Sequence, residues 1–367
     1  MAWSDLRNRL LASEAFHRFA TWFPLTRPIA QREAKNLFDL VAGFVYSQIL
    51  YACVKLNLFK LLANGPLPLN EIAQQTNLSQ ESAQRLLAAA KSLRLVEERG
   101  NDSWGLGMLG AVMVTNTAVA ALVEHHATLY ADLRDPIALL RGETDPAMAK
   151  YWPYANEHGA SPLELTEEKV AEYSQLMSAS QPLIASEILS AYSFSKHKKL
   201  LDIGGGQGTF LMAAAKKAPH LQLMLFDLPA VACLAQKNFE QAGIAGRATA
   251  YGGSFFETPL PTGADVGSII RVLYDHDDHR ALAILKAAYA ALPSGATLLV
   301  AEPMSGTPGA QAMGDAYFGF YLLAMGKGKS RSAQRLMDLI REAGFVQPEL
   351  QPTRLPLQTR LIKARRA

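Results

Sequence analysis

The stretch from Leu200 to Gly208 reads Leu-Leu-Asp-Ile-Gly-Gly-Gly-Gln-Gly, an apolar strand that leads through an acid into a glycine turn. Glycine lets a backbone turn tightly and approach a ligand closely. A second apolar run, Leu221 to Phe226, follows and ends at Asp227. An acid in that position accepts hydrogen bonds from a ribose, so the pattern predicts a nucleoside-containing ligand at the carboxyl edge of a parallel sheet.

The spacing of these glycines narrows the choice of ligand. Asp-x-Gly-Gly-Gly-x-Gly differs from the GxGxxG of dinucleotide sites, and the chain has no GxxxxGK[ST] phosphate loop, so NAD and ATP are both disfavoured. A strand-to-helix turn without a ligand is the alternative. The helix-forming run Phe210 to Lys217 and the acid-tipped strand after it favour the ligand site.

Further motifs follow in a fixed order along the chain. They are LLDIGGGQG (200–208), FDLP (226–229), GGSFF (252–256), RVLYDHDD (271–278), AEP (301–303) and REAGF (341–345). With them the chain resembles the plant-type small-molecule O-methyltransferases, a family of class I S-adenosylmethionine-dependent methyltransferases. The resemblance is strong over residues 180 to 365 and looser from 37 to 114. RVLYDHDD and the added N-terminal segment look most like the bacterial branch that methylates hydroxyneurosporene or demethylspheroidene in carotenoid synthesis.

The resemblance implies an α/β fold: a doubly wound, Rossmann-like methyltransferase domain preceded by an all-helical, winged-helix dimerisation domain. The alternation of strand and helix patterns in the second half independently predicts a doubly wound sheet. The expected strands are 199–203, 221–226, 248–252, 266–273 and 297–302, with a final antiparallel pair near 347–351 and 358–363. The expected parts are an amphipathic extension (1–36), the dimerisation domain (37–115), a helical connector with acceptor-pocket residues (116–180) and the catalytic domain (181–367).

The same resemblance implies S-adenosylmethionine as the cofactor. The glycine loop would face its methionine part and ribose, Asp227 its ribose hydroxyls, and Ser254 with Phe255 its adenine. The expected cofactor-binding residues are Asp202, Gly204, Gly205, Gly206, Gly208, Asp227, Leu228, Ser254, Phe255 and Arg271. The expected catalytic residues are Tyr274, Asp275, His276 and Glu302, and no metal site is expected.

Some positions depart from the family pattern. Ser254 stands where the family commonly has an aspartate, and a neutral hydroxyl should hold the adenine amine less strongly than a carboxylate. Tyr274 stands where many relatives carry the histidine that deprotonates a phenolic acceptor, and tyrosine, with an ordinary pKa of about 10, is a poor base near neutral pH. A second acid of the family, near Ser330, is missing, and Arg271 takes the place of a family cation with an offset of one position.

Three roles for Tyr274 stay open. It orients the acceptor hydroxyl while alignment with the sulfonium carries catalysis, or His276 or His279 supplies the base, or Tyr274 only packs. An aliphatic alcohol is far less acidic than a phenol, so its proton would leave during or after methyl transfer. An orienting tyrosine is compatible with that chemistry.

Residues 1 to 35 combine cations with apolar side chains at helical spacing. The basic residues are Arg7, Arg9, Arg18, Arg27, Arg32 and Lys35, and the acidic ones are Asp5, Glu14 and Glu33. The net charge of this segment is therefore +3, the same as that of the whole chain. Pro24 ends the helical pattern. We expect residues 1–23 to form a basic amphipathic helix that either makes peripheral contact with a membrane or packs on the protein or a dimer partner.

Composition adds further bounds. No uninterrupted apolar run reaches the roughly 18 residues of a membrane span, and no secretory signal is evident. Cys53 and Cys233 are too far apart in sequence to indicate a disulfide framework or a metal motif, which favours a reducing compartment. The expected location is cytoplasmic, with peripheral contact at the inner or photosynthetic membrane as the second expectation.

The pattern between residues 69 and 106 is that of a helix-turn-helix with a wing. Helices at 69–76 and 80–93, with Ser79 as the N-cap of the second, precede a two-stranded wing at 95–106. The second helix offers only Arg85 and Lys91 as cations, too few for phosphate neutralisation. We therefore expect no nucleic-acid partner. In the resembled family the same module packs against its twin, so the resemblance implies a homodimer, with an apolar helix over 37–63 at its centre.

Two segments are candidates for the acceptor pocket. In the connector these are His125, His126, Tyr130, Tyr151, Trp152 and Tyr154. Adjacent residues of a helix point about 100° apart, so the two histidines do not by spacing alone form a metal site. The aromatic helix at 316–325 indicates core packing on pattern alone, and by resemblance it lines the acceptor pocket.

The expected function is S-adenosylmethionine-dependent O-methylation of a hydroxyl on a hydrophobic small molecule, foremost a hydroxylated acyclic carotenoid. One rival is methylation of another pigment, a quinone or a phenolic acceptor. A rival from a different class is a winged-helix regulator that uses the cofactor fold as a sensor.

Overall fold

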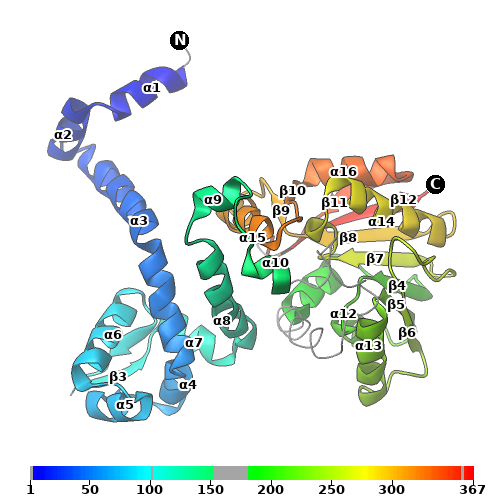
Figure 1. Cartoon of the computed structure of the whole chain (residues 1–367), viewed down its shortest axis with the longest axis horizontal. Coiled ribbons are helices and arrows are strands. Elements are labelled where there is room, and N and C mark those ends of the chain that lie inside the picture. Colours follow the sequence, from blue (N-terminus) through cyan, green and yellow to red (C-terminus); the bar gives the residue numbers. More distant parts are fainter. Residues whose placement is uncertain (1–2, 101, 152–180, 357–358) are drawn as a thin grey trace. The chain divides into compact units, whose positions relative to one another are not determined.

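The computed structural model describes residues 3–100, 102–151, 181–356 and 359–367. Contacts divide the chain into two compact units, Met1–Glu124 and His125–Ala367 (Figure 1). Each unit has its own buried apolar core.

The first unit begins with three helices: α1 (Trp3–Leu11), α2 (Glu14–Trp22) and α3 (Arg27–Lys55). The single helix expected over 1–23 is thus two, because Ser13 interrupts it as an N-cap, accepting a hydrogen bond from the Phe16 amide at 3.5 Å. The long helix expected over 37–63 was wrong at both ends. It begins ten residues earlier because Pro28 fits the first turn of a helix, and Asn57, with φ of +54°, directs the chain out of it.

The rest of this unit is the expected winged helix-turn-helix. Its elements are α4 (Leu58–Leu61), η1 (Leu62–Asn64), β1 (Leu67–Pro68), α5 (Leu69–Thr76), α6 (Gln80–Ser92), β2 (Val96–Glu98), β3 (Ser103–Leu106) and α7 (Met108–Thr115). The Ser79 hydroxyl accepts from the Ser82 amide at 3.1 Å, which confirms the predicted cap. The strand β1 was not expected because it is only two residues long and contains Pro68.

The N-terminal part of α3 carries apolar side chains that this unit does not bury. Leu40 is 81% exposed and Phe44 68% exposed. By length and composition α3 could cross a membrane, although no uninterrupted apolar run in the sequence predicted a membrane-spanning helix. The helices α7 and α8 (Thr117–Asp132) are long and apolar enough only when taken together, as a pair bent by 95°. Core helices of water-soluble proteins pass that test as well.

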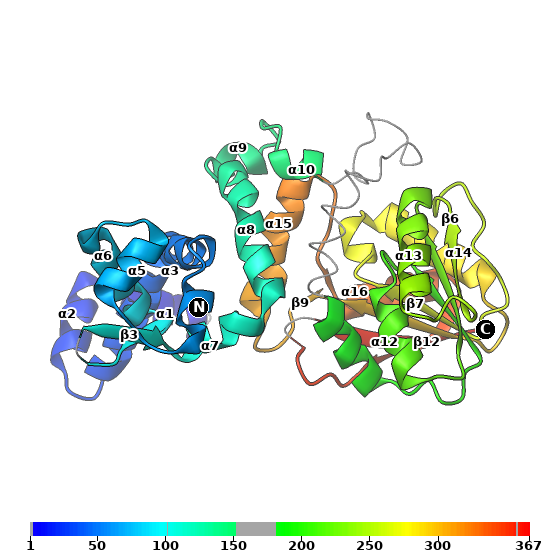
Figure 2. The same ribbon diagram turned by 90° about the horizontal axis from the view of Figure 1, so that it is seen from below.

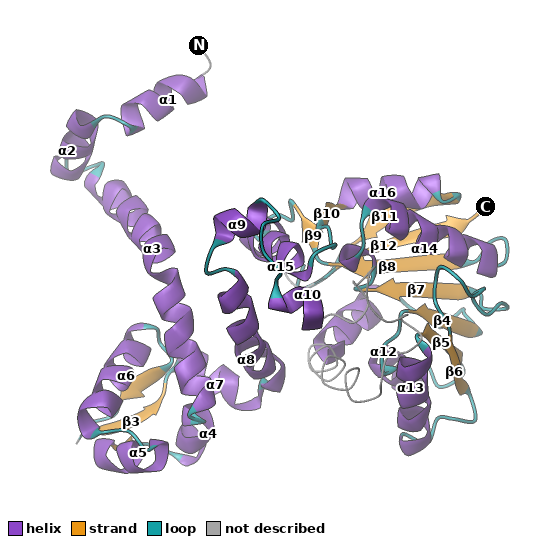
Figure 3. Cartoon of the chain, in the orientation of Figure 1, coloured by secondary structure: helices purple, strands orange, loops and turns teal. Residues whose placement is uncertain are grey.

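The second unit contains a mixed seven-stranded sheet, which confirms the predicted doubly wound fold (Figure 3). Its strands are β4 (Lys199–Ile203), β5 (Gln222–Asp227), β6 (Ala248–Gly252), β7 (Val266–Ile270), β8 (Thr297–Glu302), β11 (Phe345–Gln351) and β12 (Arg360–Arg366). Their order is β11-β12-β8-β7-β4-β5-β6, with β12 antiparallel to both of its neighbours and all other pairs parallel. The sequence pattern extended β7 to residue 273, but the strand ends at Ile270 because Arg271 has φ of +56°.

Helices cover both faces of this sheet, since neighbouring strand residues such as Leu200 and Leu201 point into opposite cores. One core packs against α12 (Thr209–Lys217), α13 (Pro229–Gln241) and the helical residues 181–191. The other packs against α14 (Asp278–Ala291) and α16 (Ala333–Glu342).

A helical layer carries the aromatic segment noted in the sequence. It consists of the C-terminal part of α8, α9 (Pro136–Leu140), α10 (Ala147–Tyr151), the π-helix η4 (Ala312–Tyr317) and α15 (Phe318–Met325). Figure 2 shows α8 alongside α15. Short elements complete the unit: η3 (Leu273–Asp275), β9 (Met304–Ser305) and β10 (Arg331–Ser332).

Candidate functional site

The strand order reverses at β4, which has β5 on one side and β7 on the other. In open α/β sheets, ligands bind outside the carboxyl ends of the strands at such a switch point. The predicted residues Asp202, Asp227 and Glu302 occupy the carboxyl ends of β4, β5 and β8. The structure therefore brings the predicted site to one edge of the sheet.

The glycine loop connects β4 to α12 in a conformation that only glycine adopts without strain. A Cβ atom on Gly205 would lie 2.7 Å from Asp202 Oδ2 and 2.8 Å from Leu225 Cδ1. Gly206 has φ of +57°, and a Cβ there would meet no atom of the described residues within 4 Å. The loop is thus packed tightly against the sheet at Gly205 and open at Gly206, where a ligand can approach the backbone.

Two carboxyl groups support this loop. Asp202 is 1% exposed and accepts a hydrogen bond from the Ser268 hydroxyl at 2.6 Å, while burial raises its pKa to about 7. Asp227 accepts from the amides of Gly206 and Leu228, both at 2.8 Å, and burial raises its pKa to about 6. Ser268 was not predicted, although it is the one hydroxyl in the apolar strand β7.

The loop after β7 carries Arg271 and Tyr274. The Arg271 amide donates to the Ala301 carbonyl at 2.8 Å, and its guanidinium donates to the Tyr274 hydroxyl at 3.4 Å. The Tyr274 ring is 4% exposed and meets Phe318 edge-on at 6.0 Å. Burial raises the pKa of Tyr274 above its ordinary value, so its hydroxyl is protonated and can donate or accept a hydrogen bond.

Asp275 belongs to the same loop, and Glu302, at the end of β8, holds the loop by its backbone amides. Glu302 Oε1 accepts from the amides of Val272 at 3.0 Å and Leu273 at 2.8 Å, and burial raises the pKa of Glu302 to about 7. Burial, together with the charge of Glu302, raises the pKa of Asp275 well above its usual range. Within the described part of the chain, Glu302 Oε2 and Asp275 Oδ1 are buried without a hydrogen-bond partner.

A different group of residues surrounds Ser254. Ser254 is buried, and its hydroxyl accepts from the Phe256 amide at 3.4 Å, while the Phe255 ring lies 5.9 Å from that of Phe226. The His276 ring meets Phe256 edge-on at 5.9 Å, and the Arg280 guanidinium lies 4.2 Å from the centre of the Phe256 ring. Burial, with the nearby cations Arg280 and Arg331, lowers the pKa of His276 to about 4.

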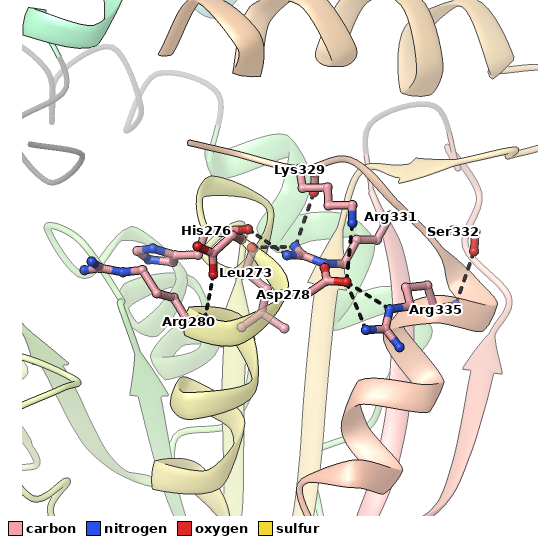
Figure 4. Close-up of polar contacts among 9 residues, drawn as sticks. Leu273, His276, Asp278, Arg280, Lys329, Arg331, Ser332 and Arg335 are labelled. Carbon is pink, nitrogen blue, oxygen red and sulfur yellow. Dashed lines mark hydrogen bonds and ion pairs between the residues drawn. The ribbon is translucent and has the colours of Figure 1, made fainter. Parts of the chain in front are cut away.

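Arg331 binds Leu273 and His276, which flank Tyr274 and Asp275 in the loop after β7, a role that was not predicted from the sequence (Figure 4). Its guanidinium donates to the carbonyls of Leu273 at 2.7 Å and His276 at 2.6 Å, and to Asp278 Oδ1 at 2.7 Å. The side chain is 1% exposed. In the sequence Arg331 is distinguished only by its place after Lys327 and Lys329. That its side chain is buried is visible only in the tertiary structure. Ser330, where the family acid is missing, donates to the Gly314 carbonyl at 2.8 Å.

The helical layer supplies two histidine–tyrosine pairs. His125 Nε2 lies 3.0 Å from the Tyr321 hydroxyl, and His126 Nε2 lies 2.8 Å from the Tyr317 hydroxyl. Burial lowers the pKa of both histidines, that of His125 to about 4. Of the other pocket candidates, Tyr130 packs edge-on against His126, whereas Trp152 and Tyr154 lie outside the described residues.

These residues fit a cationic nucleoside. One sheet edge carries four buried carboxyl groups, those of Asp202, Asp227, Asp275 and Glu302. Two of them, Asp275 and Glu302, have an oxygen atom without a hydrogen-bond partner in the described part of the chain. A ligand with a sulfonium, an ammonium and ribose hydroxyls supplies the positive charge and the donors that match these acceptors. Among the described residues, no group of three or more His, Cys, Asp and Glu side chains is arranged to hold a metal ion. Fold and site together define a class I methyltransferase.

Comparisons with known proteins identify the family to which the chain belongs. The O-methyltransferase domain matches residues 130–346, and the O-methyltransferase dimerisation domain matches residues 38–123. The chain belongs to the O-methyltransferase family, and its methyl donor is S-adenosylmethionine. The demethylspheroidene O-methyltransferase of Cereibacter sphaeroides is 42% identical over 350 residues, which cover 95% of this chain and 91% of that protein.

Two further relatives illustrate the range of similarity. The demethylspheroidene O-methyltransferase of Rhodobacter capsulatus is 38% identical over 360 residues, 98% of this chain and 89% of that protein. The crystal structure of human N-acetylserotonin methyltransferase in complex with S-adenosylmethionine has a TM-score of 0.75 at 23% identity, covering 91% of this chain and 98% of that one. The latter shows the shared fold.

Proposed function

We propose that this enzyme transfers a methyl group from S-adenosylmethionine to a hydroxyl of a hydroxylated acyclic carotenoid, of the hydroxyneurosporene or demethylspheroidene type. The similarity to two demethylspheroidene O-methyltransferases over nearly the whole chain carries the proposal. The apolar cluster that joins Tyr274 to α15 supports it, because Leu129, Leu322 and Met325 surround Tyr274 with hydrocarbon and sulfur, an environment that suits a hydrocarbon acceptor.

The proposed cofactor contacts follow from the site. The open backbone at Gly206 would receive the methionine part and the ribose, and the Asp227 carboxylate would accept from the ribose hydroxyls. Ser254 and Phe255 would contact the adenine. When bound, S-adenosylmethionine supplies an electrophilic methyl on a sulfonium. The chain's own residues align the acceptor hydroxyl with that methyl, exclude water and take up the released proton.

A single substitution tests the assignment of Ser254. Ser254→Asp is expected to tighten cofactor binding several-fold, on the order of 1 kcal/mol, because a carboxylate accepts from an adenine amine more strongly than a neutral hydroxyl. Ser254→Ala should weaken binding by a similar factor. Calorimetric titration with S-adenosylmethionine measures both. If neither variant changes the affinity, Ser254 does not contact the adenine.

We propose that Tyr274 orients the acceptor hydroxyl, because its ring belongs to the apolar cluster whereas the His276 ring packs on Phe256. Tyr274→Phe should therefore lower kcat more than His276→Ala, with roughly tenfold loss for the lost hydrogen bond, about 1.4 kcal/mol. Steady-state rates of both variants at saturating cofactor measure this. The reverse order would assign the base role to His276.

A regulatory role that depends on DNA is disfavoured by the charges on α6. Arg85 forms an ion pair with Glu81 at 2.9 Å, and Lys91 forms one with Glu98 at 2.7 Å. The two cations of the would-be recognition helix are thus already neutralised. The matched dimerisation domain supports a homodimer instead, with the exposed apolar face of α3 available to the second copy.

We further propose that α1 and α2 attach the enzyme peripherally to an anionic membrane, which would bring it to a carotenoid dissolved in lipid. Trp3 is 78% exposed and Trp22 70% exposed, and cations lie between the apolar residues of both helices. Residues 1–37 precede the matched dimerisation domain, so this segment is additional to it.

The full-length protein should float with vesicles that contain phosphatidylserine and much less with phosphatidylcholine alone, because each cation near an anionic surface contributes about 1 kcal/mol. Trp22→Ser and Arg9→Gln should each reduce the bound fraction, whereas Arg85→Gln in α6 should not. Failure to float with either vesicle type contradicts the proposal. Binding that survives high salt and alkaline carbonate would indicate a spanning α3 instead.

A further inference from the structure

Two histidine–tyrosine pairs join α8 to the segment formed by η4 and α15. His125 pairs with Tyr321 and His126 with Tyr317, and the two tyrosines are one helical turn apart. The Tyr317 and Tyr321 rings lie 5.7 Å apart. Tyr317 ends a π-helix, a local irregularity that is frequent at functional sites because it redirects side chains.

The His125–Tyr321 pair extends toward the candidate catalytic loop. Tyr321 is 5% exposed and belongs to the same apolar cluster as Tyr274, and the Phe318 ring lies 6.0 Å from Tyr274 and 6.4 Å from Tyr321. Burial raises the pKa of Tyr321, and the nearby Tyr274 and Tyr317 raise it further. The Phe318 ring thus lies near both Tyr274 of the loop and Tyr321, the partner of His125.

Of the other bases around the loop, the His276 ring and Glu302 Oε1 are engaged elsewhere, whereas Glu302 Oε2 and Asp275 Oδ1 have no hydrogen-bond partner among the described residues. The His276 ring packs on Phe256, and its backbone carbonyl accepts from Arg331. Glu302 Oε1 accepts two backbone amides and fixes the loop itself. Tyr274 has no neighbouring histidine of its own among the contacts described for the loop, whereas Tyr321 has His125 at 3.0 Å.

We propose that His125, through the Tyr321 hydroxyl, takes up the proton that the acceptor alcohol releases during methyl transfer. This rests on the proposed function. The acceptor oxygen forms a bond to the methyl carbon as the carbon–sulfur bond breaks, which leaves S-adenosylhomocysteine and a proton on the new ether oxygen. That proton passes to the Tyr321 oxygen as the Tyr321 proton passes to His125 Nε2, and the imidazolium then loses it to solvent.

A weak base suffices for this step. A protonated dialkyl ether is a far stronger acid than an imidazolium, so even a histidine whose pKa burial has lowered to about 4 accepts its proton. The same burial keeps His125 neutral at physiological pH, and therefore ready to accept. Removing the proton also prevents return of the methyl to the thioether, because a neutral ether is a poor methyl donor.

The two pairs provide matched variants for a test. His125→Gln retains hydrogen-bonding capacity toward Tyr321 but cannot take up a proton, and His126→Gln makes the same change one residue away. We expect His125→Gln and Tyr321→Phe to lower kcat by roughly 100-fold, within the usual range for removal of a general base, with KM for both substrates within about threefold of wild type. His126→Gln and Tyr317→Phe, which change pocket residues outside the proposed relay, should lower kcat by less than about tenfold.

Chemical rescue separates a proton acceptor from a packing residue. Activity of His125→Ala should recover on addition of imidazole, in proportion to the free-base fraction as pH is varied. The inference is overturned if both glutamine variants lose activity equally, if the loss is in KM alone, or if imidazole has no effect on a folded His125→Ala. Wild-type turnover of the carotenoid alcohol tests the proposed function separately, because the variant ratios are measured with whichever hydroxyl acceptor the wild type methylates.

Discussion

Replacing Asp227 with asparagine is expected to weaken S-adenosylmethionine binding about 100-fold, roughly 2.8 kcal/mol at about 1.4 kcal/mol per factor of ten. The carboxylate accepts from Gly206 and Leu228, and the proposed ribose hydrogen bonds to a charged acceptor are each worth about 1.5–3 kcal/mol. An amide offers one acceptor oxygen and turns a donor toward the other partner. Isothermal titration measures the change.

Asp265 provides a matched control for this variant. It also accepts from two backbone amides, those of Lys198 at 3.0 Å and Lys199 at 2.7 Å, but beside the opposite end of β4. Asp265→Asn should therefore lower stability without changing cofactor affinity. Equal cofactor affinity in both variants would contradict the role of Asp227.

The affinity of the wild-type protein for S-adenosylmethionine should also fall as pH decreases through 6, because burial raises the pKa of Asp227 to about 6 and the protonated carboxyl accepts hydrogen bonds less well.

Replacing Arg331 with methionine should lower the free energy of unfolding by about 3–5 kcal/mol and abolish most activity. The change leaves the carbonyls of Leu273 and His276 without their buried donor and releases the loop that positions Tyr274. Thermal or chemical unfolding gives the stability. Activity should be assayed well below the melting temperature, so that loss of loop geometry is distinguished from unfolding.

Arg335 provides a control for this variant, because it binds the carboxylate of Asp278, as Arg331 does, but its own side chain is partly exposed to solvent. Its guanidinium donates to Asp278 Oδ2 at 2.9 Å, and its side chain is 44% exposed. Arg335→Met should lower the free energy of unfolding by less than about 1 kcal/mol and leave kcat nearly unchanged.

The pKa of Asp278 predicts how stability depends on pH. Burial opposes ionisation of Asp278, but hydrogen bonds from Arg331 and Arg335 outweigh burial and lower the pKa of Asp278 to about 2. The stability from this carboxylate is thus present above about pH 4 and is lost as pH falls toward 2.

The parts of the fold that local patterns determine were predictable from the sequence. Strands β4, β6 and β8 lie at the expected residues. The strands β4 and β8 are apolar runs that lead to an acid, and β6 ends at Gly252, which is followed by a second glycine, Gly253. The bounds of α3 were not predictable from the sequence, because several of its first residues are polar and the proline in its first turn resembles a signal that ends a helix.

The candidate site divides in the same way. The glycine loop and Asp227 are adjacent to their strands in sequence, so motif and spacing located them. Ser268 and Arg331 act on residues 66 and 58 positions away, and a sequence pattern contains no signal for such pairings. The histidines of α8 were noted as pocket candidates, but only the tertiary structure pairs them with Tyr317 and Tyr321.

The central proposal is that the methyl acceptor is a carotenoid alcohol. Incubation of the purified enzyme with methyl-labelled S-adenosylmethionine and a membrane pigment extract, followed by chromatography of the labelled products, tests it most directly. The account predicts label in a methoxylated acyclic carotenoid that migrates as a less polar pigment than its alcohol precursor. Label in an aqueous phenolic product, with none in the carotenoids, would contradict it.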